Sequence, residues 1–381
     1  LRAFHGPANV KWFGAKGDNV ADDTAAVQAA ITAVRDIVLP RGTYKISSTI
    51  TLAEYGSVMG EGRGRTYIQA NNVSGPVFYN GDTFTHRQEI SGLGIKGSAT
   101  NAIKIYNCTG CKVSDVLAYG TFTNAFEFSY CFGCLFQYLS TDGATISNAA
   151  FRLYDYFNAN QCDLWYTQTT YIPIGVLFDT GANCGGNVFN TLTLQGCTVG
   201  LQTNNVNIDG LTINALYTEN TVAALSLGIG GTYSVRGVSI NGGTIGGAGA
   251  NPNAAQRNAQ FRLNYVIGAN INGVAFGCVT GSPRDSDAIA YHTAYNVVVS
   301  GCRGGGSDFA LETFIRYLPS AVSSSDITLI GCSRAQGSTN LTSATIRRVD
   351  GSHKYAKEYL DTNGDRVVST FTIQAAQTPP S

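Results

Sequence analysis

The sequence predicts an all-β protein that folds as a parallel β-helix, a solenoid of stacked coils of short strands, with a capping helix near its N-terminus. Two observations carry this prediction. Short apolar segments recur every 23 to 25 residues along the chain. Each follows a segment in which apolar and small polar residues alternate, which is the two-residue period of a β-strand. Turns rich in Gly, Asn and Thr separate these segments, and no helical segment of useful length lies between them, which argues against βαβ units.

The length of the repeat is measured from the small residue that opens each apolar segment. The steps between these residues are 23, 25, 25, 25 and 24 positions. The residues are Ala102, Ala125, Ala150, Gly175, Gly200 and Ala224. Alternating strand segments continue as far as 327–332, so we expect the solenoid to extend over residues 37–335, with inward side chains stacked from coil to coil.

Composition agrees with this fold class and excludes several functions. The chain has 45 Gly and 10% aromatic residues, as expected for short strands joined by many turns. Only 13% of its residues are charged and its formal net charge is zero. Nucleic acid and anionic membrane surfaces are therefore not expected partners, because either would require a basic surplus. No apolar run reaches about 18 residues, so we expect no insertion into a membrane.

The two ends of the solenoid have to be covered, since an open coil exposes a sheet edge. The segment ADDTAAVQAAITAV (21–34) predicts a helix with Asp22 or Asp23 as N-cap and with Val27, Ile31 and Val34 on one face. Three regions follow: an N-terminal segment with the capping helix (1–36), the β-helix (37–335), and a C-terminal cap or oligomerisation segment (336–381). The first residues lack Met, so we expect a further N-terminal domain to precede them.

Four cysteines have a spacing that is typical of a zinc site, Cys108-x-x-Cys111 and Cys131-x-x-Cys134. Both steps between the pairs are 23 residues, which is also the coil repeat. We therefore interpret these cysteines as small apolar residues stacked at corresponding corners of two coils. Zinc held by four converging thiols is the alternative. With this interpretation, we expect no metal ligands and no cofactor.

Three stretches carry a family resemblance: VKWFGAKGDNVADDTAAVQAAI (10–31), IVLPRGTYKISSTITL (37–52) and GSVMGEGRGRTYI (56–68). They resemble the start of the pectate-lyase-like right-handed β-helix superfamily, in particular its bacteriophage tailspikes and capsule depolymerases. The resemblance implies right-handed coils and a homotrimer on a phage tail, attached to other tail proteins through the preceding domain. It also implies that this part of the virion acts at the host cell surface, where it binds and cuts a polysaccharide of the capsule or O-antigen. The matched stretches are specific for the fold and much less so for the reaction.

Hydrolysis of a glycan needs two carboxyl groups about 5 to 9.5 Å apart. One coil step is about 4.8 Å, so a catalytic pair should lie on adjacent or next-adjacent coils. Asp155 and Asp179 occupy nearly equivalent positions of adjacent coils, and they are the predicted pair. The alternative is that both are turn residues at strand ends.

Two further carboxylates are candidates for the catalytic site. Glu219 follows a strand in a longer turn, beside Tyr217, which would offer a sugar-stacking face. Asp142 lies at the comparable turn three coils earlier, too far to pair with Glu219 in one chain but able to line the same groove. A solvated turn carboxylate is the alternative for Glu219.

The segment 154–171 is rich in aromatic residues, whose faces can stack on sugar rings. Its candidates for substrate binding are Tyr154, Tyr156, Trp165, Tyr166 and Tyr171. Alternation along the strands directs about half of such residues outward. Arg152 is a further candidate, although it occupies the same outward position as Glu127 on the preceding coil, which predicts an ion pair between them.

The family resemblance implies a phage tailspike that binds and depolymerises a bacterial surface polysaccharide, and the candidate carboxylates favour hydrolysis by a carboxylate pair. A polysaccharide lyase on the same fold and a non-catalytic glycan-binding adhesin are the alternatives.

Overall fold

The computed structural model describes most of the chain up to residue 334 and several segments beyond it. The described residues are 6–180, 183–219, 223–229, 234–246, 258–277, 286–291, 293–304, 313–317, 326–334, 341–347, 355–360 and 366–371. The chain divides into two compact units, residues 1–202 and 203–381, which are treated separately below. In the described part of the chain, no helix is both long and apolar enough to cross a membrane.

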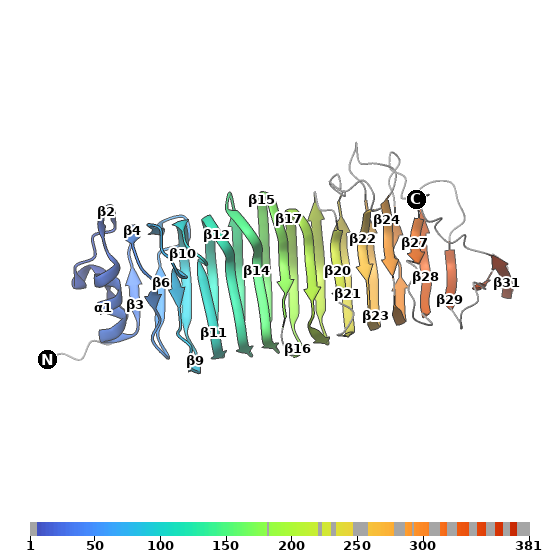
Figure 1. Ribbon diagram of the computed structural model, residues 1–381, viewed down its shortest axis with the longest axis horizontal. Helices are drawn as coiled ribbons and strands as arrows, with labels where there is room; N and C mark the ends of the chain where they lie inside the picture. The colour runs from blue at the N-terminus through green and yellow to red at the C-terminus, as the bar shows by residue number, and fades with distance from the viewer. Residues whose placement is uncertain are drawn as a thin grey trace, which may run out of the picture. The chain divides into compact units, whose positions relative to one another are not determined.

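Unit 1 consists almost entirely of strands, drawn in blue to green in Figure 1. Its first elements are β1 (Ala8–Asn9), the 3-10 helix η1 (Val10–Phe13), β2 (Asp18–Asp22), α1 (Thr24–Val34), β3 (Ile37–Leu39), β4 (Gly42–Ile46), β5 (Ile50–Thr51), β6 (Ser57–Gly60), β7 (Thr66–Ala70), β8 (Phe78–Tyr79) and β9 (Thr85–His86). Longer strands follow: β10 (Glu89–Ser98), β11 (Ile103–Thr109), β12 (Lys112–Phe132), β13 (Leu135–Asp142), β14 (Thr145–Asn158), β15 (Gln161–Phe178), β16 (Asn183–Gly185) and β17 (Val188–Asn204).

Parallel pairing between equivalent strands of successive coils confirms the predicted β-helix. Ile103 of β11 pairs with Phe126 of β12, and Phe126 pairs in turn with Phe151 of β14. The series continues to Val176 of β15. These residues directly follow the small residues from which the repeat was measured, and all four side chains are buried. The sequence period is therefore the coil length, as expected.

Aromatic rings fill the interior of unit 1. The indole of Trp165 stacks on Phe151 with ring centroids 4.3 Å apart, and Phe128 stacks on Phe136 at 4.1 Å. All four of these side chains are buried. Stacked rings of this kind bury large apolar areas and add pairwise attraction, so the ladder of aromatic residues is a main source of stability for these coils.

The capping helix α1 is present, but its predicted contacts need two corrections. Asp23 occupies the N-cap position, yet its carboxylate accepts hydrogen bonds from the backbone N–H groups of Lys16 (2.6 Å) and Gly17 (3.0 Å) instead of capping the helix. Asp22 accepts the N–H of the first helical residue, at 3.0 Å. Val34 is 38% exposed because it is the last helical residue, so the buried face of α1 ends at Ile31.

A bend inside the strands turns each coil through one of its corners. In β10 the bend lies at Gly92, whose φ is +68°, and in β12 it lies at Asp115, whose φ is +52°. Ser91 pairs with Ser114 on one side of this corner and Leu93 with Val116 on the other. The corner residue interrupts the in-out alternation of its strand. Because each coil has a corner at the equivalent position, paired residues on either side of it keep the same orientation, toward the interior or toward solvent, from coil to coil.

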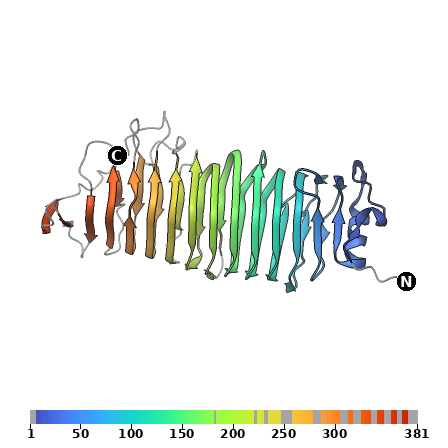
Figure 2. The ribbon, with the colours of Figure 1, turned by 180° about the vertical axis from the view of Figure 1, so that it is seen from behind.

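Unit 2 repeats the parallel architecture, seen from behind in Figure 2. Its strands are β18 (Asn207–Asp209), β19 (Thr212–Glu219), β20 (Ala223–Ile229), β21 (Val235–Ile245), β22 (Asn258–Leu263), β23 (Val266–Phe276), β24 (Ser286–Tyr291), β25 (Ala294–Ser300), β26 (Arg303–Gly304), β27 (Thr313–Tyr317), β28 (Asp326–Arg334), β29 (Leu341–Arg347), β30 (Tyr355–Leu360) and β31 (Arg366–Phe371). Parallel pairing reaches β28, which then pairs with β29 in the antiparallel sense. β30 and β31 form a separate antiparallel pair.

Close approach of two coils at Gly97 leads to the first testable prediction. A Cβ atom at Gly97 would lie 1.9 Å from the backbone oxygen of Ala70, and its φ of +88° already disfavours any side chain. Gly133 also has a positive φ, +60°, but a Cβ there would meet nothing within 4 Å. We expect Gly133→Ala to lower the free energy of unfolding by about 1 kcal/mol. Gly97→Ala should cost about 1 to 3 kcal/mol more, because the backbone must move. Urea denaturation of both variants measures the difference, and equal losses would contradict the close approach.

Candidate functional site

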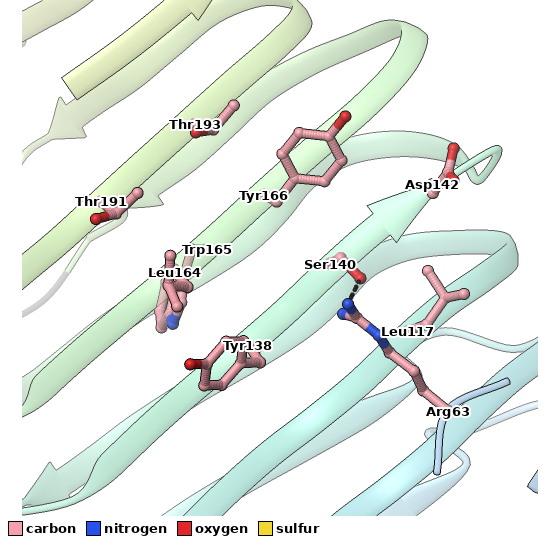
Figure 3. Close-up of a pocket in the computed structure, with 10 residues that line it drawn as sticks. All are labelled: Arg63, Leu117, Tyr138, Ser140, Asp142, Leu164, Trp165, Tyr166, Thr191 and Thr193. Carbon is pink, nitrogen blue, oxygen red and sulfur yellow. Dashed lines mark hydrogen bonds between the residues drawn. The ribbon is translucent and has the colours of Figure 1, made fainter. Parts of the chain in front are cut away.

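A groove on the surface of unit 1, named here the Arg63 groove, has a volume of about 460 Å³. Figure 3 shows the side chains that line it, which come from the turn before β7 and from β12, β13, β15 and β17. They are Arg63, Leu117, Tyr138, Ser140, Asp142, Leu164, Trp165, Tyr166, Thr191 and Thr193.

The parallel register of the strands brings these side chains into one row. Leu117 pairs with Ser140, and Ser140 pairs with Tyr166 on the next coil. Asp142 lies two residues after Ser140 on the same strand, and it pairs with Gln168. Because residues two apart in a strand point to the same face, Ser140 and Asp142 both project outward into the groove.

Arg63 is the cation of the groove and is held at two points. Its Nε lies 3.3 Å from a carboxylate oxygen of Asp115, and its Nη1 donates to Ser140 Oγ at 3.2 Å, the contact drawn in Figure 3. The side chains of Arg63 and Asp115 are 42% and 45% exposed, so this ion pair contributes little to stability. A guanidinium offers five N–H donors in a planar fork. An anionic group of a ligand can therefore bind Arg63 beside the residues that orient it.

The tyrosines give the groove aromatic and hydroxyl surfaces. Tyr138 is 50% exposed at a coil corner. The hydroxyl of Tyr166 donates to Gln168 and lies 3.4 Å from the side-chain oxygen of Gln195. An exposed ring beside hydroxyl and amide groups is the combination that sugars require, since they present C–H faces and polar edges together.

The corner residues of the groove have an unfavourable backbone conformation. Tyr138, Leu164 and Thr191 have φ values of +53°, +54° and +56°. Such left-handed conformations cost about 1 to 2 kcal/mol for residues with a Cβ atom. In unit 2, one series of corners that stack from coil to coil is formed by small residues, whereas Tyr265 has a left-handed φ of +51° outside this series. The small residues are Ala215, Gly242, Gly273, Gly301 and Gly331. Large side chains are thus placed at strained corners where the groove lies, which is a pattern found at functional sites.

A second surface of unit 1 carries a run of alternating charges, named here the ionic ladder. Lys104 Nζ lies 3.0 Å from Glu127 Oε1, and Arg152 Nη1 lies 3.2 Å from Glu127 Oε2. Arg152 Nε reaches Asp179 Oδ2 at 2.9 Å. The predicted ion pair between Glu127 and Arg152 is confirmed. Asp179 is engaged by Arg152 in this ladder, and Arg152 also lies over the ring of Tyr154, 4.3 Å from its centroid.

The ladder is largely shielded from water. The Glu127 side chain is only 6% exposed, and its carboxylate also accepts a hydrogen bond from Asn124 at 2.8 Å. Burial raises the pKa of Glu127, but the neighbouring Lys104 ammonium and Arg152 guanidinium outweigh burial and hold that pKa below its usual value. These contacts describe a structural network, in which Arg152 and Asp179 hold neighbouring coils together.

Asp155 has a structural environment as well. It lies at a coil corner with a φ of +53°, a conformation that Asp tolerates better than most residues. Its carboxylate accepts a hydrogen bond from Ser129 Oγ at 3.0 Å. Close by, three tyrosines form a stripe across successive coils: Tyr106 and Tyr130 have ring centroids 5.3 Å apart, as do Tyr130 and Tyr156. Tyr156 is 37% exposed, so this tyrosine stripe is a second surface on which a glycan can stack.

Trp165 was expected to present its ring to a sugar, and the structure corrects this expectation. The side chain is 1% exposed, and its indole N–H donates to the backbone oxygen of Phe136 at 3.0 Å, beneath the floor of the groove. The left-handed corner at Leu164 shifts the alternation of β15 by one residue, which turns Trp165 inward. The Tyr171 side chain lies outside the described residues.

The remaining candidates, Tyr217 and Glu219, belong to β19 of unit 2. The Tyr217 hydroxyl donates to Glu219 Oε2 at 3.1 Å, and Tyr217 is 37% exposed. The candidates from the sequence are thus distributed over three places. Asp142 and Tyr166 line the Arg63 groove, and Arg152, Tyr154, Asp155, Tyr156 and Asp179 lie near the ionic ladder and the tyrosine stripe.

Sequence reasoning did not identify Arg63, Asp115 or Tyr138 as part of a site. Arg63 and Ser140 are 77 positions apart in the sequence, and the coil repeat does not predict that these two positions are in contact. One signal was available: bulky residues at Tyr138, Leu164 and Thr191 fall where most of the other coils have Gly immediately after the alternating strand.

The parallel coils and the aromatic groove define a β-helix protein with a surface suited to carbohydrate. The chain belongs to the family described as rhamnogalacturonase A/epimerase, pectate lyase-like, whose model matches residues 8–249. This match confirms the resemblance to the pectate-lyase-like superfamily.

Individual relatives are partial or distant. Mannuronan C5-epimerase AlgE1 of Azotobacter vinelandii is 40% identical over 86 residues, which cover 18% of this chain and 6% of the epimerase. The pre-neck appendage protein of Bacillus phage phi29 is 28% identical over 159 residues, covering 37% of this chain and 18% of that protein. The solved structure of PfbA, a surface adhesin of Streptococcus pneumoniae, has a TM-score of 0.56 at 13% identity and covers 96% of this chain and 100% of that chain. That similarity shows the shared fold.

Proposed function

We propose that this chain binds a bacterial surface polysaccharide in the Arg63 groove and cleaves it, with Asp142 as the residue that transfers a proton. The observation that carries the proposal is the convergence of an acid, a cation and two tyrosines on neighbouring coils of one groove. The left-handed corners at Tyr138 and Leu164 support it, because large side chains are held there at a backbone cost, whereas the stacked corners of unit 2 from Ala215 to Gly331 carry small residues.

The chemistry of the groove assigns a role to each group. Tyr138 provides a face for stacking, and Tyr166 provides a hydroxyl for the polar edge of a sugar. Arg63 pairs with an acidic substituent of the glycan. Asp142 gives a proton to the leaving glycosidic oxygen, a step that hydrolysis and β-elimination share.

The hydrolysis with paired carboxylates that the sequence predicts requires a second carboxyl group about 5 to 9.5 Å from the first. Among the described residues that line the groove, Asp142 is the one carboxylate, and the neighbouring Asp115 carboxylate is engaged in the ion pair with Arg63. This observation favours β-elimination of an acidic glycan, in which Arg63 neutralises the uronate carboxylate and so makes the neighbouring C–H more acidic. The Asp142 carboxylate accepts that proton and then gives it to the leaving glycosidic oxygen, as the C=C bond forms and the C–O bond breaks. The relative named as a mannuronan C5-epimerase acts on a uronate polymer, which supports this choice.

The products of cleavage test the reaction. Incubation with a panel of acidic capsular polysaccharides should release new reducing ends together with the ultraviolet absorbance of an unsaturated uronate. Reducing ends without that absorbance would show hydrolysis, and they would overturn the elimination. The groove's single carboxylate also favours a second candidate, a non-catalytic adhesin; this function would be shown by retention of a polysaccharide in affinity electrophoresis with no cleavage of any member of the panel.

We further propose that the chain is part of a phage tail and assembles as a homotrimer. The similarity to the pre-neck appendage protein of phage phi29 supports the phage assignment. A solution mass of three times 40.2 kDa by light scattering is the expected result, and a mass of one chain would contradict the trimer.

A variant of Tyr138 distinguishes an effect on the stability of the fold from an effect on glycan binding. We expect Tyr138→Gly to change the free energy of unfolding by less than about 1 kcal/mol, since relief of the left-handed backbone offsets the added entropy of the unfolded chain. The same variant should bind the glycan several-fold more weakly, because a stacking face is lost. Tyr55→Gly is the matched control: Tyr55 is 52% exposed with a φ of +56°, but it lies outside the groove. Equal affinities for the two variants would contradict the role of Tyr138.

A further inference from the structure

Four cysteines meet inside unit 1 at the corner between β11 and β12 and the corner between β12 and β13. Cys108 pairs with Cys131 across adjacent coils, and Leu135 N–H donates to the backbone oxygen of Cys111 at 2.9 Å, which places Cys111 beside Cys134. Each of the four side chains is at most 2% exposed. The stacking expected from the 23-residue step is therefore present, and the four thiols share one enclosed space.

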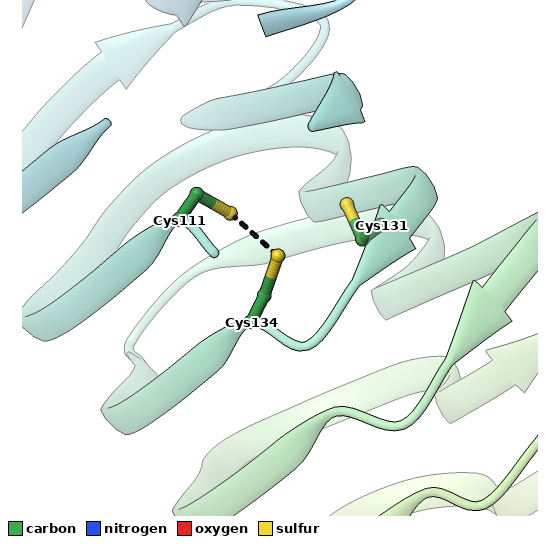
Figure 4. A group of neighbouring side chains, drawn as sticks. All are labelled: Cys111, Cys131 and Cys134. Atoms are coloured by element: carbon green, nitrogen blue, oxygen red, sulfur yellow. Dashed lines mark hydrogen bonds between the residues drawn. The ribbon is translucent and has the colours of Figure 1, made fainter. Parts of the chain in front are cut away.

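The sulfur atoms are closer together than stacking alone requires. Cys111 Sγ and Cys134 Sγ are 3.1 Å apart, as Figure 4 shows, and the sulfur atoms of Cys111, Cys131 and Cys134 all lie within 4.8 Å of one another. A tetrahedral ion with metal–sulfur bonds of about 2.3 Å needs sulfur atoms roughly 3.8 Å apart. The Cys111–Cys134 pair is closer than that value, and the other two pairs of this group are at most 4.8 Å apart.

Cys108 lies beside this group of three. It pairs with Cys131 on the next coil, and its backbone oxygen lies 3.7 Å from Cys134 Sγ. Its sulfur lies outside the 4.8 Å group, so the Cys108 side chain has to turn toward the other three to act as the fourth ligand. In the part of the chain that the structure describes, no other group of three metal-binding side chains is comparably close.

We propose that Cys108, Cys111, Cys131 and Cys134 form a tetrahedral site for a zinc ion that joins two coils from inside the solenoid. Four thiolates without an open position are the ligand set of structural zinc sites. The soft sulfur ligands exclude calcium and magnesium, which take oxygen ligands. The two Cys-x-x-Cys turns supply two ligands each, and the coil repeat superimposes them.

The cysteine site adjoins a strand that lines the Arg63 groove. Cys134 directly precedes β13, the strand that carries Tyr138, Ser140 and Asp142 into the Arg63 groove. A metal bound at Cys134 would fix the start of this strand relative to the preceding coil. Because the ligands come together only when both coils have formed, binding of the ion is expected to be coupled to folding.

Metal analysis of the protein tests the proposal. The chain is produced in zinc-supplemented medium, washed with a chelator to remove loosely held ions, and measured by inductively coupled plasma mass spectrometry; we expect one zinc ion per chain. Growth with cobalt instead should give the charge-transfer and d–d absorption bands of tetrahedral cobalt bound to thiolates. Cys111→Ser and Cys134→Ser should lose the metal. Cys184→Ser and Cys197→Ser, which change equally buried cysteines outside the cluster, should retain it.

Three results would overturn the proposal. The first is protein without metal in which all four thiols react with an alkylating agent after denaturation. The second is an intact mass lower by two hydrogens, which would show a disulfide between Cys111 and Cys134. The third is zinc that Cys184→Ser loses as readily as Cys134→Ser. Where a cluster variant fails to fold, the cobalt spectrum and the thiol count of the unaltered chain still decide. The proposal does not depend on glycan cleavage, so it can fail or succeed separately from the proposed function.

Discussion

Replacing Asp142 with Asn is expected to lower the rate of glycan cleavage about 100-fold or more, while the midpoint of thermal unfolding stays unchanged. Asn keeps the size of the side chain but cannot give a proton to the leaving oxygen. Asp142 lies at the end of β13 and is exposed in the groove, so its replacement removes no buried contact. The assay measures new reducing ends under conditions in which the substrate saturates the protein.

The other carboxylates suggested by the sequence are natural controls for Asp142. Asp155→Asn and Glu219→Gln should keep cleavage activity within a few-fold of the unaltered chain, since Asp155 is held at a corner by Ser129 and Glu219 lies in unit 2 beside Tyr217. A large loss of activity in either control, with full activity in Asp142→Asn, would show that the active site has been placed in the wrong part of the molecule.

Replacing Glu127 with Gln is expected to lower the free energy of unfolding by about 3 kcal/mol or more. Glu127 stands between Lys104 and Arg152 in the ionic ladder, and both cations are themselves about three-quarters buried. Gln has nearly the same shape but no charge, so the poorly solvated Lys104 ammonium loses its carboxylate partner and Arg152 keeps only Asp179. Urea denaturation at neutral pH provides the measurement.

An exposed pair provides the matched control. Glu89 and Lys112 also lie 2.9 Å apart on adjacent coils, but their side chains are 35% and 43% exposed. Glu89→Gln should therefore cost at most about 1 kcal/mol. Equal losses for Glu127→Gln and Glu89→Gln would contradict the assigned burial of the ladder.

The pH dependence of stability follows from the lowered pKa of Glu127. A carboxyl group whose pKa is lower in the folded than in the unfolded state contributes stability that is fully present above the unfolded value. That contribution is lost as the pH falls from the ordinary value of 4.5 through the lower folded value. The stability difference between the unaltered chain and Glu127→Gln should therefore shrink as the solution is acidified below pH 4.5. A difference that stays constant with pH would exclude Glu127 as the group responsible.

The repeat made much of the fold predictable. Each coil contributes equivalent strands, and parallel pairing requires equivalent residues to lie side by side. The register of Ile103, Phe126 and Phe151 follows from this rule. So do the stacking of Cys108 on Cys131 and the ion pair between Glu127 and Arg152. All of these are contacts between neighbouring coils, which is the range over which a period in the sequence carries information.

The groove could not be predicted in the same way, for two physical reasons. Arg63 reaches Ser140 from a turn outside the repeat, and no period relates the two positions. The left-handed corners also shift the alternation inside a strand. A corner residue such as Leu164 adds one position, so the residues after it face the side opposite to the one that a two-residue period predicts. The aromatic content of 154–171 made Trp165 a candidate for the surface, whereas the corner turns it into the core.

The most direct test of the account is a crystal structure of the Asp142→Asn variant with an oligosaccharide of a polysaccharide that the unaltered chain binds. The account predicts a sugar in the Arg63 groove, with a ring against Tyr138, an acidic substituent at Arg63 and the glycosidic oxygen facing residue 142. An oligosaccharide bound along the tyrosine stripe of Tyr106, Tyr130 and Tyr156, or on unit 2, with the Arg63 groove empty, would contradict it.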